Sequence, residues 1–531
     1  MAQQNQLTGQ PVIILRDNVE QTRGYEAQRS NILAAKAVSE AVRTTLGPRG
    51  MDKMLVAGDD ITLTNDGATI LSELSVQHPG AKMVVEVATA QDDECGDGTT
   101  TAAIMVGSFM EQAERLLKLG IHPTNISKGY SLGMRKALEI LSELAITVSP
   151  DDKESLKKIA TTAMVGKTIE AVREKASDIV VDAVATVATR TDEKITIDED
   201  DILVKTQKGD SMDDIELVQG VIIGKSRVDE QMPRIVKGAK VAMIGSPLEI
   251  TKTQTKAKIK ISSSEQVAAF GDAEREQLKK LADQIIDSGA NVLLCQKGIA
   301  DPVQYYLAKA GIYAVEDVPE KEMKYAAKAL CGEIVNKPED LSLETLGTAD
   351  QVEKLYGEDL TKISGCENAK AVTIFIRGST QYLVDELDRA INDAKRVIQD
   401  AMEDGKYTIG GGSVETEMLV RIRDYATTVG GREQIAIEAF ASAFEIIPIT
   451  LAENSGFNPI DKLVELKKAH VDGQKYAGLN VFTGKIVDME KEGVYEPMRV
   501  KRQAIQSASE IASLLIRVDD MMVTQSHGPG M

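Results

Sequence analysis

The sequence predicts a multi-domain protein whose helix-rich ends fold together around an inserted α/β centre. The chain has 531 residues, more than one hydrophobic core usually supports, so several domains are expected. Apolar residues recur at helical spacing through most of residues 1–149 and again after residue 405. Between residues 224 and 369, strand and helix patterns alternate. Because the two ends share one pattern and the middle has another, the centre is predicted to be an insertion.

Composition excludes several classes of function. The 82 acidic and 62 basic residues give a formal net charge of −20, and such a surface repels nucleic acid and anionic membranes. The four cysteines and four histidines are scattered without a Cys-x-x-Cys or His-Glu-x-x-His motif, so neither a zinc site nor a disulfide framework is expected. There is no signal-peptide pattern, and no apolar run approaches the roughly 20 residues of a membrane span. We therefore expect a cytoplasmic protein with no nucleic-acid or membrane partner.

The N-terminal part reads mostly as helix. A short apolar strand is expected at 11–15, and residues 31–46 have helical spacing up to a break at 47–50. Residues 54–56 and 61–64 have β character and lead to a sharp turn at 65–67. The remaining helices are expected at 81–92, at 100–119 and, after a cap at 122–125, up to about residue 146.

Beyond residue 149 the pattern changes twice. Helices to about 162 and over 169–188 precede strands at 202–206, 215–223, 241–244, 291–295, 312–315 and 371–376, with helices at 302–310 and 320–330. Residues 251–280 are polar and are expected to project from this α/β part, and a long surface loop explains their composition equally well. The last part has helices at 380–402, 414–425, 433–451, 463–469 and 500–518, with strands near 479–482 and 486–489. The helix at 433–451 is expected to bend at Pro448.

One stretch, ECGDGTTT at 94–101, carries most of the predicted chemistry. Its two glycines permit a tight turn, which delivers backbone N–H groups and three hydroxyls to the start of a helix. The first N–H groups of a helix lack internal partners, and the helix dipole favours negative charge there, so the stretch predicts a phosphate site. Asp97 in the same turn can hold Mg²⁺ against phosphate oxygens. The alternative without function is an Asp-Gly turn with a threonine cap between two helices.

Four further segments can converge on the same nucleotide, although each has an ordinary structural interpretation. Residues 45–50 can close over phosphates or simply end a helix. The Asn-Asp-Gly sequence at 65–67 is also a common hairpin turn. Asp393 lies mid-helix among charged residues, where a solvated surface position is the alternative. The three glycines at 410–412 allow close approach to a ligand or form a plain linker.

A family resemblance is carried by motifs that run through nearly the whole chain. They are TLGP at 45–48, NDGATIL at 65–71, GDGTT at 96–100, GGG at 410–412, GGREQ at 430–434, LAENSG at 451–456, VFTGK at 481–485 and AIQSA at 504–508. In this order and spacing the sequence resembles group II chaperonin subunits, most closely those of the archaeal thermosome type. Residues 291–297 and 306–311 extend the resemblance through the middle of the chain.

The resemblance implies a three-part subunit in a double-ring assembly. It implies a mainly α equatorial ATPase domain (1–149 and 405–531), an α/β intermediate hinge domain (150–218 and 370–404) and an α/β apical client-binding domain (219–369), whose helical protrusion at about 248–281 acts as a lid. It also implies identical or paralogous subunits in two stacked rings of about eight, ATP and Mg²⁺ as cofactors, and non-native polypeptides as clients.

The resemblance also implies roles for individual residues. Asp97 is expected to be the metal ligand, and the phosphate loop is expected to consist of Gly98, Thr99, Thr100 and Thr101, with Gly47 on the other side. Asp66 and Asp393 are expected to orient the attacking water, and Lys167 to lie near the γ-phosphate. Gly412 and Glu496 are expected to contact base and ribose. Positioning and charge neutralisation of this kind are what phosphoryl transfer requires.

Some details depart from the family, and two other functions remain open. Arg49 stands where the family usually has lysine, and the Met-Pro at 232–233 lacks the usual preceding His-Pro. A small-molecule kinase would need an acceptor pocket with a defined base, and the sequence offers no convincing one. A structural ring subunit that binds nucleotide without hydrolysis is the other alternative, and the presence of Asp66, Asp97 and Asp393 argues against it.

Overall fold

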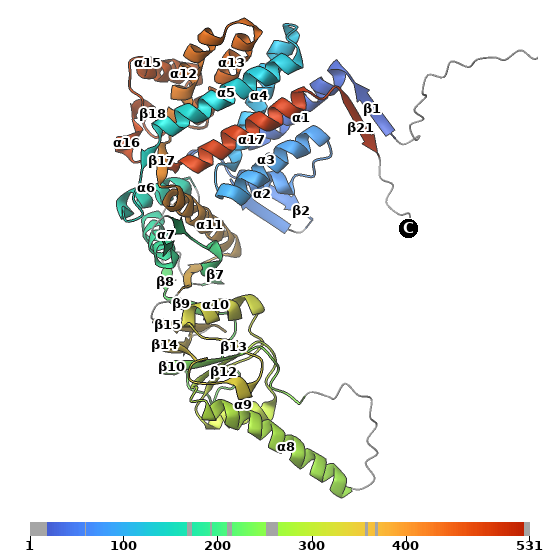
Figure 1. Ribbon diagram of the computed structural model, residues 1–531, viewed down its shortest axis with the longest axis vertical. Helices are drawn as coiled ribbons and strands as arrows, with labels where there is room; N and C mark the ends of the chain where they lie inside the picture. The colour runs from blue at the N-terminus through green and yellow to red at the C-terminus, as the bar shows by residue number, and fades with distance from the viewer. Residues whose placement is uncertain are drawn as a thin grey trace, which may run out of the picture. The chain divides into compact units, whose positions relative to one another are not determined.

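The computed structural model describes residues 19–524 except 59, 167–171, 192–193, 210–214, 251–263, 356–358 and 367–369. The strand expected at 11–15 therefore lies outside the described residues. The chain divides into two compact units (Figure 1). Unit 1 comprises Met1–Ala145, Thr408–Val494 and Met498–Met531, and unit 2 comprises Ile146–Tyr407 and Tyr495–Pro497.

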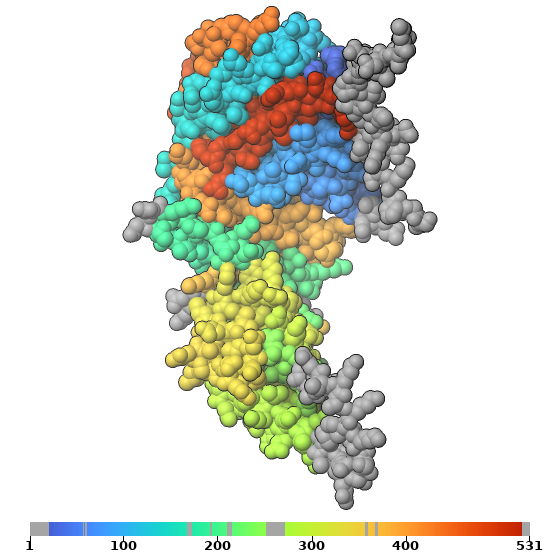
Figure 2. Space-filling model, turned by 45° about the vertical axis from the view of Figure 1, so that its right-hand side comes forward, coloured from blue at the N-terminus to red at the C-terminus, as the bar shows by residue number. Residues whose placement is uncertain are grey.

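Unit 1 is mainly helical and is built from both ends of the chain. Its helices are α1 (Tyr25–Arg43), α2 (Gly67–Glu73), α3 (Pro79–Cys95), α4 (Thr99–Lys118), α5 (Pro123–Leu144), α12 (Ser413–Val429), α13 (Gly431–Ala443), α14 (Ile446–Asn454), α15 (Pro459–Val471), α16 (Met489–Glu492) and α17 (Met498–Ile516). Three antiparallel strand pairs accompany them: β1 (Val19–Arg23) with β21 (Asp520–Thr524), β2 (Lys53–Ala57) with β3 (Asp60–Thr64), and β18 (Ala477–Asn480) with β19 (Lys485–Asp488). Figure 2 shows α17, in red, lying beside the blue N-terminal helices, against which it packs.

The core of unit 1 is centred on α4. Every residue from Ala102 to Met110 is buried, so this helix is covered on all sides rather than along one stripe. It packs against α1, α3, α13 and α17. The Ser39 hydroxyl on α1 donates to the Ala103 carbonyl at 2.6 Å, which indicates a close approach of the two helices. The start of α4, where the predicted phosphate turn lies, is therefore held by the best-packed part of the unit.

Small residues let α5 and α13 approach closely. Gly129 lies against Ala436, and a Cβ on Gly133 would lie 2.6 Å from the Phe440 ring. Phe440 stacks on Phe109 with ring centroids 4.7 Å apart. The chain has no tryptophan and only 4% aromatic residues, so this small aromatic cluster sits within an otherwise aliphatic core.

The expected bend at Pro448 is wrong in its position. The helix breaks earlier, at residues 444–445, where i,i+3 hydrogen bonds to Ala441 and Ser442 end α13. In a continuous helix the proline ring would clash with the carbonyl four residues before it, which is that of Phe444. Pro448 instead stands in the first turn of α14, where its missing N–H is tolerated.

Together, α13 and α14 form a long apolar stretch, although no membrane-spanning run was expected from the sequence. By length and composition Gly431–Asn454 is apolar enough to cross a membrane. However, 61% of its most apolar window is buried inside the unit, as in the core helix of a soluble protein.

Unit 2 is α/β, with two larger sheets. The three-stranded sheet has the order β7 (Ile202–Lys208), β16 (Val372–Gly378), β8 (Glu216–Val218). The seven-stranded sheet has the order β12 (Tyr313–Val315), β11 (Val292–Cys295), β10 (Ile235–Ile244), β14 (Gly347–Lys354), β15 (Thr361–Ser364), β9 (Gly220–Ile223), with β13 (Ile334–Val335) also pairing with β10. Its helices are α6 (Lys153–Met164), α7 (Arg173–Val187), α8 (Ser264–Asp287), α9 (Asp301–Lys309), α10 (Glu320–Leu330) and α11 (Gln381–Asp404). Two-residue strands β5 (Thr189–Arg190) and β6 (Ile195–Thr196) form a hairpin.

The seven-stranded sheet is covered on both faces. Strand β10 alternates, with Val241 and Met243 in one hydrophobic cluster and Ala242 and Ile244 in another. Helix α10 contributes to the first cluster, and α8 and α9 contribute to the second. Strands β10, β11 and β12 are parallel, as expected for a sheet buried on both faces. The mainly α part and the α/β part thus confirm the predicted fold class.

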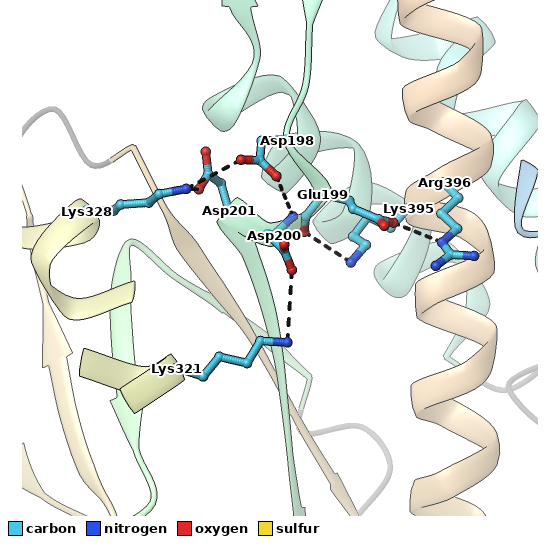
Figure 3. A network of polar contacts seen from close by, with 8 residues as sticks. All are labelled: Asp198, Glu199, Asp200, Asp201, Lys321, Lys328, Lys395 and Arg396. Atoms are coloured by element: carbon cyan, nitrogen blue, oxygen red, sulfur yellow. Dashed lines mark hydrogen bonds and ion pairs between the residues drawn. The ribbon is translucent and has the colours of Figure 1, made fainter. Parts of the chain in front are cut away.

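Helices α10 and α11 both bind an acidic turn, residues 198–201 (Figure 3). Lys328 on α10 pairs with Asp201 and, at 3.5 Å, with Asp198. On α11, Arg396 pairs with the Glu199 carboxylate at 2.9 Å, while Lys395 donates to the Glu199 carbonyl at 3.3 Å. Burial lowers the pKa of the Lys395 ammonium. The acidic turn therefore joins a helix of the seven-stranded sheet to the long helix α11.

The division of unit 2 into intermediate and apical domains stays a prediction. The unit boundaries differ slightly from the expected ranges, because β20 (Tyr495–Pro497) is grouped with unit 2. A short sheet explains this grouping. Its order is β20, β17 (Lys406–Ile409), β4 (Ile146–Thr147), and β20 also packs against α6 and α11 of unit 2.

Candidate functional site

The predicted phosphate turn connects α3 to α4 through two left-handed glycines. Gly96 ends α3 with φ 67°, and Gly98 precedes α4 with φ 80°, a region that side-chain-bearing residues rarely adopt. Between them, the Asp97 carboxylate accepts a hydrogen bond from the Gly98 N–H at 2.7 Å. No side chain at the Gly98 cap position bonds to the first turn of α4. Thr101 lies half-buried in that first turn.

Asp66 joins this turn to the start of a second helix. One carboxylate oxygen caps α2 by accepting the Thr69 N–H at 2.7 Å, and the other accepts the Thr99 hydroxyl at 3.0 Å. Gly67 lies directly against Thr100, since a Cβ on Gly67 would lie 2.6 Å from the Thr100 hydroxyl oxygen. The N-termini of α2 and α4 therefore meet, and both helix dipoles favour negative charge at this point.

The segment at 45–50 reaches the same place. The Thr45 hydroxyl lies 3.4 Å from that of Thr100, and both side chains are buried. Asn454, at the end of α14, donates to the carbonyls of Arg43 at 3.1 Å and Leu46 at 2.9 Å. These bonds tie the end of α1 and the start of the 45–50 segment to α14.

Helix α14 lies against two of the glycine segments. A Cβ on Gly47 would lie 2.5 Å from Leu451, and one on Gly412 would lie 3.2 Å from Pro448. Gly412 stands at the N-cap of α12 with φ 76°. In consequence α14 connects the 45–50 segment with the three glycines at 410–412.

The structure thus brings part of the predicted set together in unit 1. Asp66, Asp97, Gly98, Thr99, Thr100 and Thr101 surround the start of α4, with Gly47 and Gly412 linked to them through Thr45 and α14. Asp393 and Glu496 belong to unit 2, the first mid-way along α11 and the second in β20, and both are half-buried. Lys167 lies outside the described residues.

The site has the donor set that a magnesium–triphosphate requires. Across the described ranges, no three His, Cys, Asp or Glu side chains cluster as a protein-only metal site. Mg²⁺ does not need such a cluster, because it usually keeps waters and binds one or two carboxylates together with phosphate oxygens. A carboxylate, that of Asp97, lies in the turn before α4, and the N–H groups at the start of a helix are of the kind that binds phosphate.

Residues that support the site by contacts to its backbone or to neighbouring helices could not be predicted from the sequence. They are Gln91, which bonds to the Asp97 carbonyl; Asn454; and the buried ion pair between Lys501 and Glu415. The partners of these side chains lie mostly hundreds of residues away, so no local pattern reveals them.

Comparison with known proteins identifies close relatives along the whole chain. Residues 38–526 match the TCP-1/cpn60 chaperonin family. The sequence is 49% identical over 522 residues to thermosome subunit beta of Archaeoglobus fulgidus, covering 98% of this chain and 96% of that protein. It is 50% identical over 520 residues to a thermosome subunit of Methanopyrus kandleri, covering 97% and 95%. Among solved structures, the open-state monomer of a group II chaperonin from Methanococcoides burtonii has a TM-score of 0.60 at 42% identity, covering 80% of this chain and 100% of that one.

Proposed function

The chain belongs to the TCP-1/cpn60 chaperonin family, and on that premise we propose that it hydrolyses Mg-ATP to drive closure of a protein-folding chamber. The observation that carries this proposal is the hydrogen bond between Asp66 and Thr99, which joins the N-terminus of α2 to that of α4, directly after the turn that carries Asp97. This is a geometry for binding polyphosphate and a divalent cation together.

In the proposed mechanism the residues of unit 1 bind and orient the nucleotide. Backbone N–H groups of Gly98–Thr101 hold the phosphates, the segment around Gly47 covers them, and Gly412 contacts the base. Asp97 would hold Mg²⁺, which when bound would neutralise charge on the phosphates. Asp66 helps to orient the attacking water beside the Thr99 hydroxyl, because its carboxylate already lies at the start of α4.

The residues of unit 2 are proposed to complete the site on closure. Asp393 on α11 would join Asp66 in orienting the attacking water, Lys167 would lie near the γ-phosphate and Glu496 would contact the ribose. Because Asp393 and Asp97 belong to different units, hydrolysis would depend on how the units close, which couples chemistry to motion.

The assembly is proposed to contain two stacked rings of about eight identical or paralogous subunits in the cytoplasm. Non-native polypeptides would be its clients, bound by the part of unit 2 that carries the seven-stranded sheet. Helix α8 would belong to the protrusion that closes the chamber. Tyr305 on α9 is 56% exposed and offers apolar surface of the kind a client site needs.

Phosphate release measured with and without Mg²⁺ tests the catalytic part of the proposal. Asp393→Ala should bind ATP but hydrolyse it far more slowly, because the water loses one of its two orienting carboxylates. Asp385→Ala, on the same helix and bonded to Gln381, is the matched control and should keep wild-type turnover. Full turnover by Asp393→Ala would remove that role.

Negative-stain imaging of the purified protein tests the assembly. The proposal expects rings with a built-in lid. A monomeric particle that still hydrolyses ATP would favour a small-molecule kinase, and rings that bind nucleotide without phosphate release would favour a structural subunit.

A further inference from the structure

A buried glutamine ties the phosphate turn to the last helix of unit 1. Gln91 on α3 is 0% exposed. Its amide nitrogen donates to the Asp97 carbonyl at 2.8 Å and to the Val500 carbonyl at 3.1 Å. Both partners are acceptors, so the NH₂ group must face them and the orientation of the amide is fixed.

The burial of this amide has a cost that packing alone does not explain. Its oxygen is buried and has no hydrogen-bond partner in the described part of the chain. An unsatisfied buried acceptor destabilises the fold, and an apolar side chain of the same size would avoid this penalty. The two donated bonds are therefore the feature that distinguishes glutamine from methionine or leucine here.

The turn itself rests on Gln91 and Val500. A Cβ on Gly98 would lie 2.7 Å from the Val500 side chain and 3.1 Å from the Gln91 nitrogen. Asp97 stands between two glycines, which are the residues with the greatest backbone freedom. A bond to the carbonyl of Asp97 thus acts at the residue that lies between these two glycines.

The other end of the connection is also anchored. Lys501 follows Val500 in the first turn of α17, and its ammonium pairs with Glu415 at 2.7 Å. The two side chains are only 8% and 4% exposed. Glu415 lies in the first turn of α12, three residues after Gly412. The first turn of α17 therefore connects the Asp97 turn to the glycine segment proposed to contact the base.

We propose that Gln91 is a positioning residue for nucleotide turnover. By holding the Asp97 carbonyl against α17, it leaves the Asp97 carboxylate and the first N–H groups of α4 in one arrangement toward the nucleotide. This inference rests on the proposed ATPase function for its catalytic consequence. The restraint of the turn does not depend on that function and can be measured separately.

The test compares two variants with a matched control in the full-length protein. Gln91→Met removes both donated bonds at similar volume. Gln91→Glu keeps the shape but places an acceptor-only carboxylate against two carbonyls. Gln503→Met makes the same change at a half-buried glutamine of α17 that bonds to Ser507 instead of the turn. Amide hydrogen exchange at residues 96–100 is measured beside kcat and KM for Mg-ATP.

Gln91→Met should speed exchange at 96–100 while distant helices keep their protection. It should lower kcat/KM roughly ten- to a hundredfold, because small misplacements of a catalytic group cost rates of this order. Gln91→Glu should be worse than Gln91→Met in both measurements. Gln503→Met should stay within about twofold of wild type in kcat/KM, since it leaves the turn untouched.

Three results would overturn the positioning role. Wild-type exchange and turnover in both Gln91 variants would show that the bonds restrain nothing. Equal loss of protection throughout unit 1 would show a purely structural role. So would wild-type exchange and turnover in the isosteric Gln91→Glu variant when Gln91→Met loses both. If the wild-type protein hydrolyses no ATP, the proposed function fails, whereas the exchange data still decide whether Gln91 holds the turn.

Discussion

Asp66 and Thr99 are joined by a 3.0 Å hydrogen bond between carboxylate and hydroxyl, although 33 residues separate them in the sequence. Thr99 is 4% exposed and Asp66 is half-buried, so removal of the hydroxyl leaves a partly buried carboxylate oxygen with one bond fewer. Thr99→Val should destabilise unit 1 by about 1–3 kcal/mol and weaken Mg-ATP binding. Thr99→Ser retains the hydroxyl and should retain most of both. Calorimetry and nucleotide titration measure these effects, and unchanged ATP binding by Thr99→Val would contradict the proposed site.

We expect unit 1 to lose stability in mild acid because of His78, the N-cap residue of α3. The His78 Nδ1 atom accepts the Gly80 N–H at 3.1 Å, and its Nε2 atom lies 2.9 Å from the Ser30 hydroxyl. Burial lowers the pKa of His78. The folded protein therefore binds this proton less readily than the unfolded chain, whose histidine pKa is about 6.5. The contribution of neutral His78 to the free energy of unfolding is complete above a pH of about 6.5 and is lost as pH falls below it toward the folded pKa.

Replacement of this histidine isolates the effect. His78→Asn keeps an acceptor at the N-cap but does not titrate, so the thermal midpoint should vary less between pH 7.5 and 5.5 than in wild type. His122→Asn, at the exposed N-cap of α5, is the matched control and should keep the wild-type slope. An unchanged slope in His78→Asn would assign the acid sensitivity to other groups.

The sequence predicted best those elements whose signal is local. The apolar stripe expected at 380–402 is the helix α11, Gln381–Asp404, and the pattern expected at 100–119 is α4. Interruptions were harder, because a proline acts on the carbonyl four residues earlier, and the break at 444–445 therefore precedes Pro448. The pairing of β1 with β21 has no local signal, since Val19 and Thr524 stand at opposite ends of the chain.

The candidate site divides in the same way. Segments at 45–50, 65–67 and 96–101 were predicted to converge, and the Asp66–Thr99 and Thr45–Thr100 contacts place them together. Gln91 was missed because it resembles any glutamine in a helix, and only its burial and its bond to Val500 distinguish it. The joint action of Asp393 with Asp97 stays a prediction, because the two residues belong to different units.

The contact between α5 and α13 predicts the effect of a single methyl group. A Cβ on Gly129 would overlap the Ala436 methyl group and lie 3.2 Å from the Glu433 carbonyl oxygen. Neither group can move by rotation of a side chain, because one is a Cβ and the other belongs to the backbone. Gly129→Ala should therefore destabilise unit 1 by about 1–3 kcal/mol through overpacking, seen as a lower thermal midpoint. Gly271→Ala is the matched control in α8, where nothing lies within 4 Å, and should be neutral or slightly stabilising. Equal effects of the two changes would contradict this account.

The acidic turn at 198–201 should make unit 2 sensitive to salt. Lys328→Met removes the cation that pairs with Asp198 and Asp201 (Figure 3). The carboxylates of the turn then repel one another without that compensating charge. The expected loss is about 1 kcal/mol at low ionic strength, because the pairs are partly exposed. It should largely vanish near 1 M salt, where the screening length is about 3 Å. Lys324→Met removes only an exposed pair with Glu320 and is the control. A salt-independent loss in Lys328→Met would indicate packing rather than charge.

The buried ion pair between Lys501 and Glu415 should behave differently when it is broken and when it is replaced. Lys501→Met leaves the Glu415 carboxylate without its 2.7 Å partner in an almost fully buried place, which is expected to cost about 3–5 kcal/mol. The double change Lys501→Met with Glu415→Leu removes the stranded charge as well and should recover most of the thermal midpoint.

Because α12 and α17 would then touch through apolar groups, the fold can be restored without the charge pair. Lys501→Met, Glu415→Leu and the double variant form a thermodynamic cycle. Because the two residues are in direct contact, the coupling free energy between them should exceed about 1 kcal/mol in magnitude. A double variant as unstable as Lys501→Met alone would show that the lysine stabilises α17 through contacts other than Glu415.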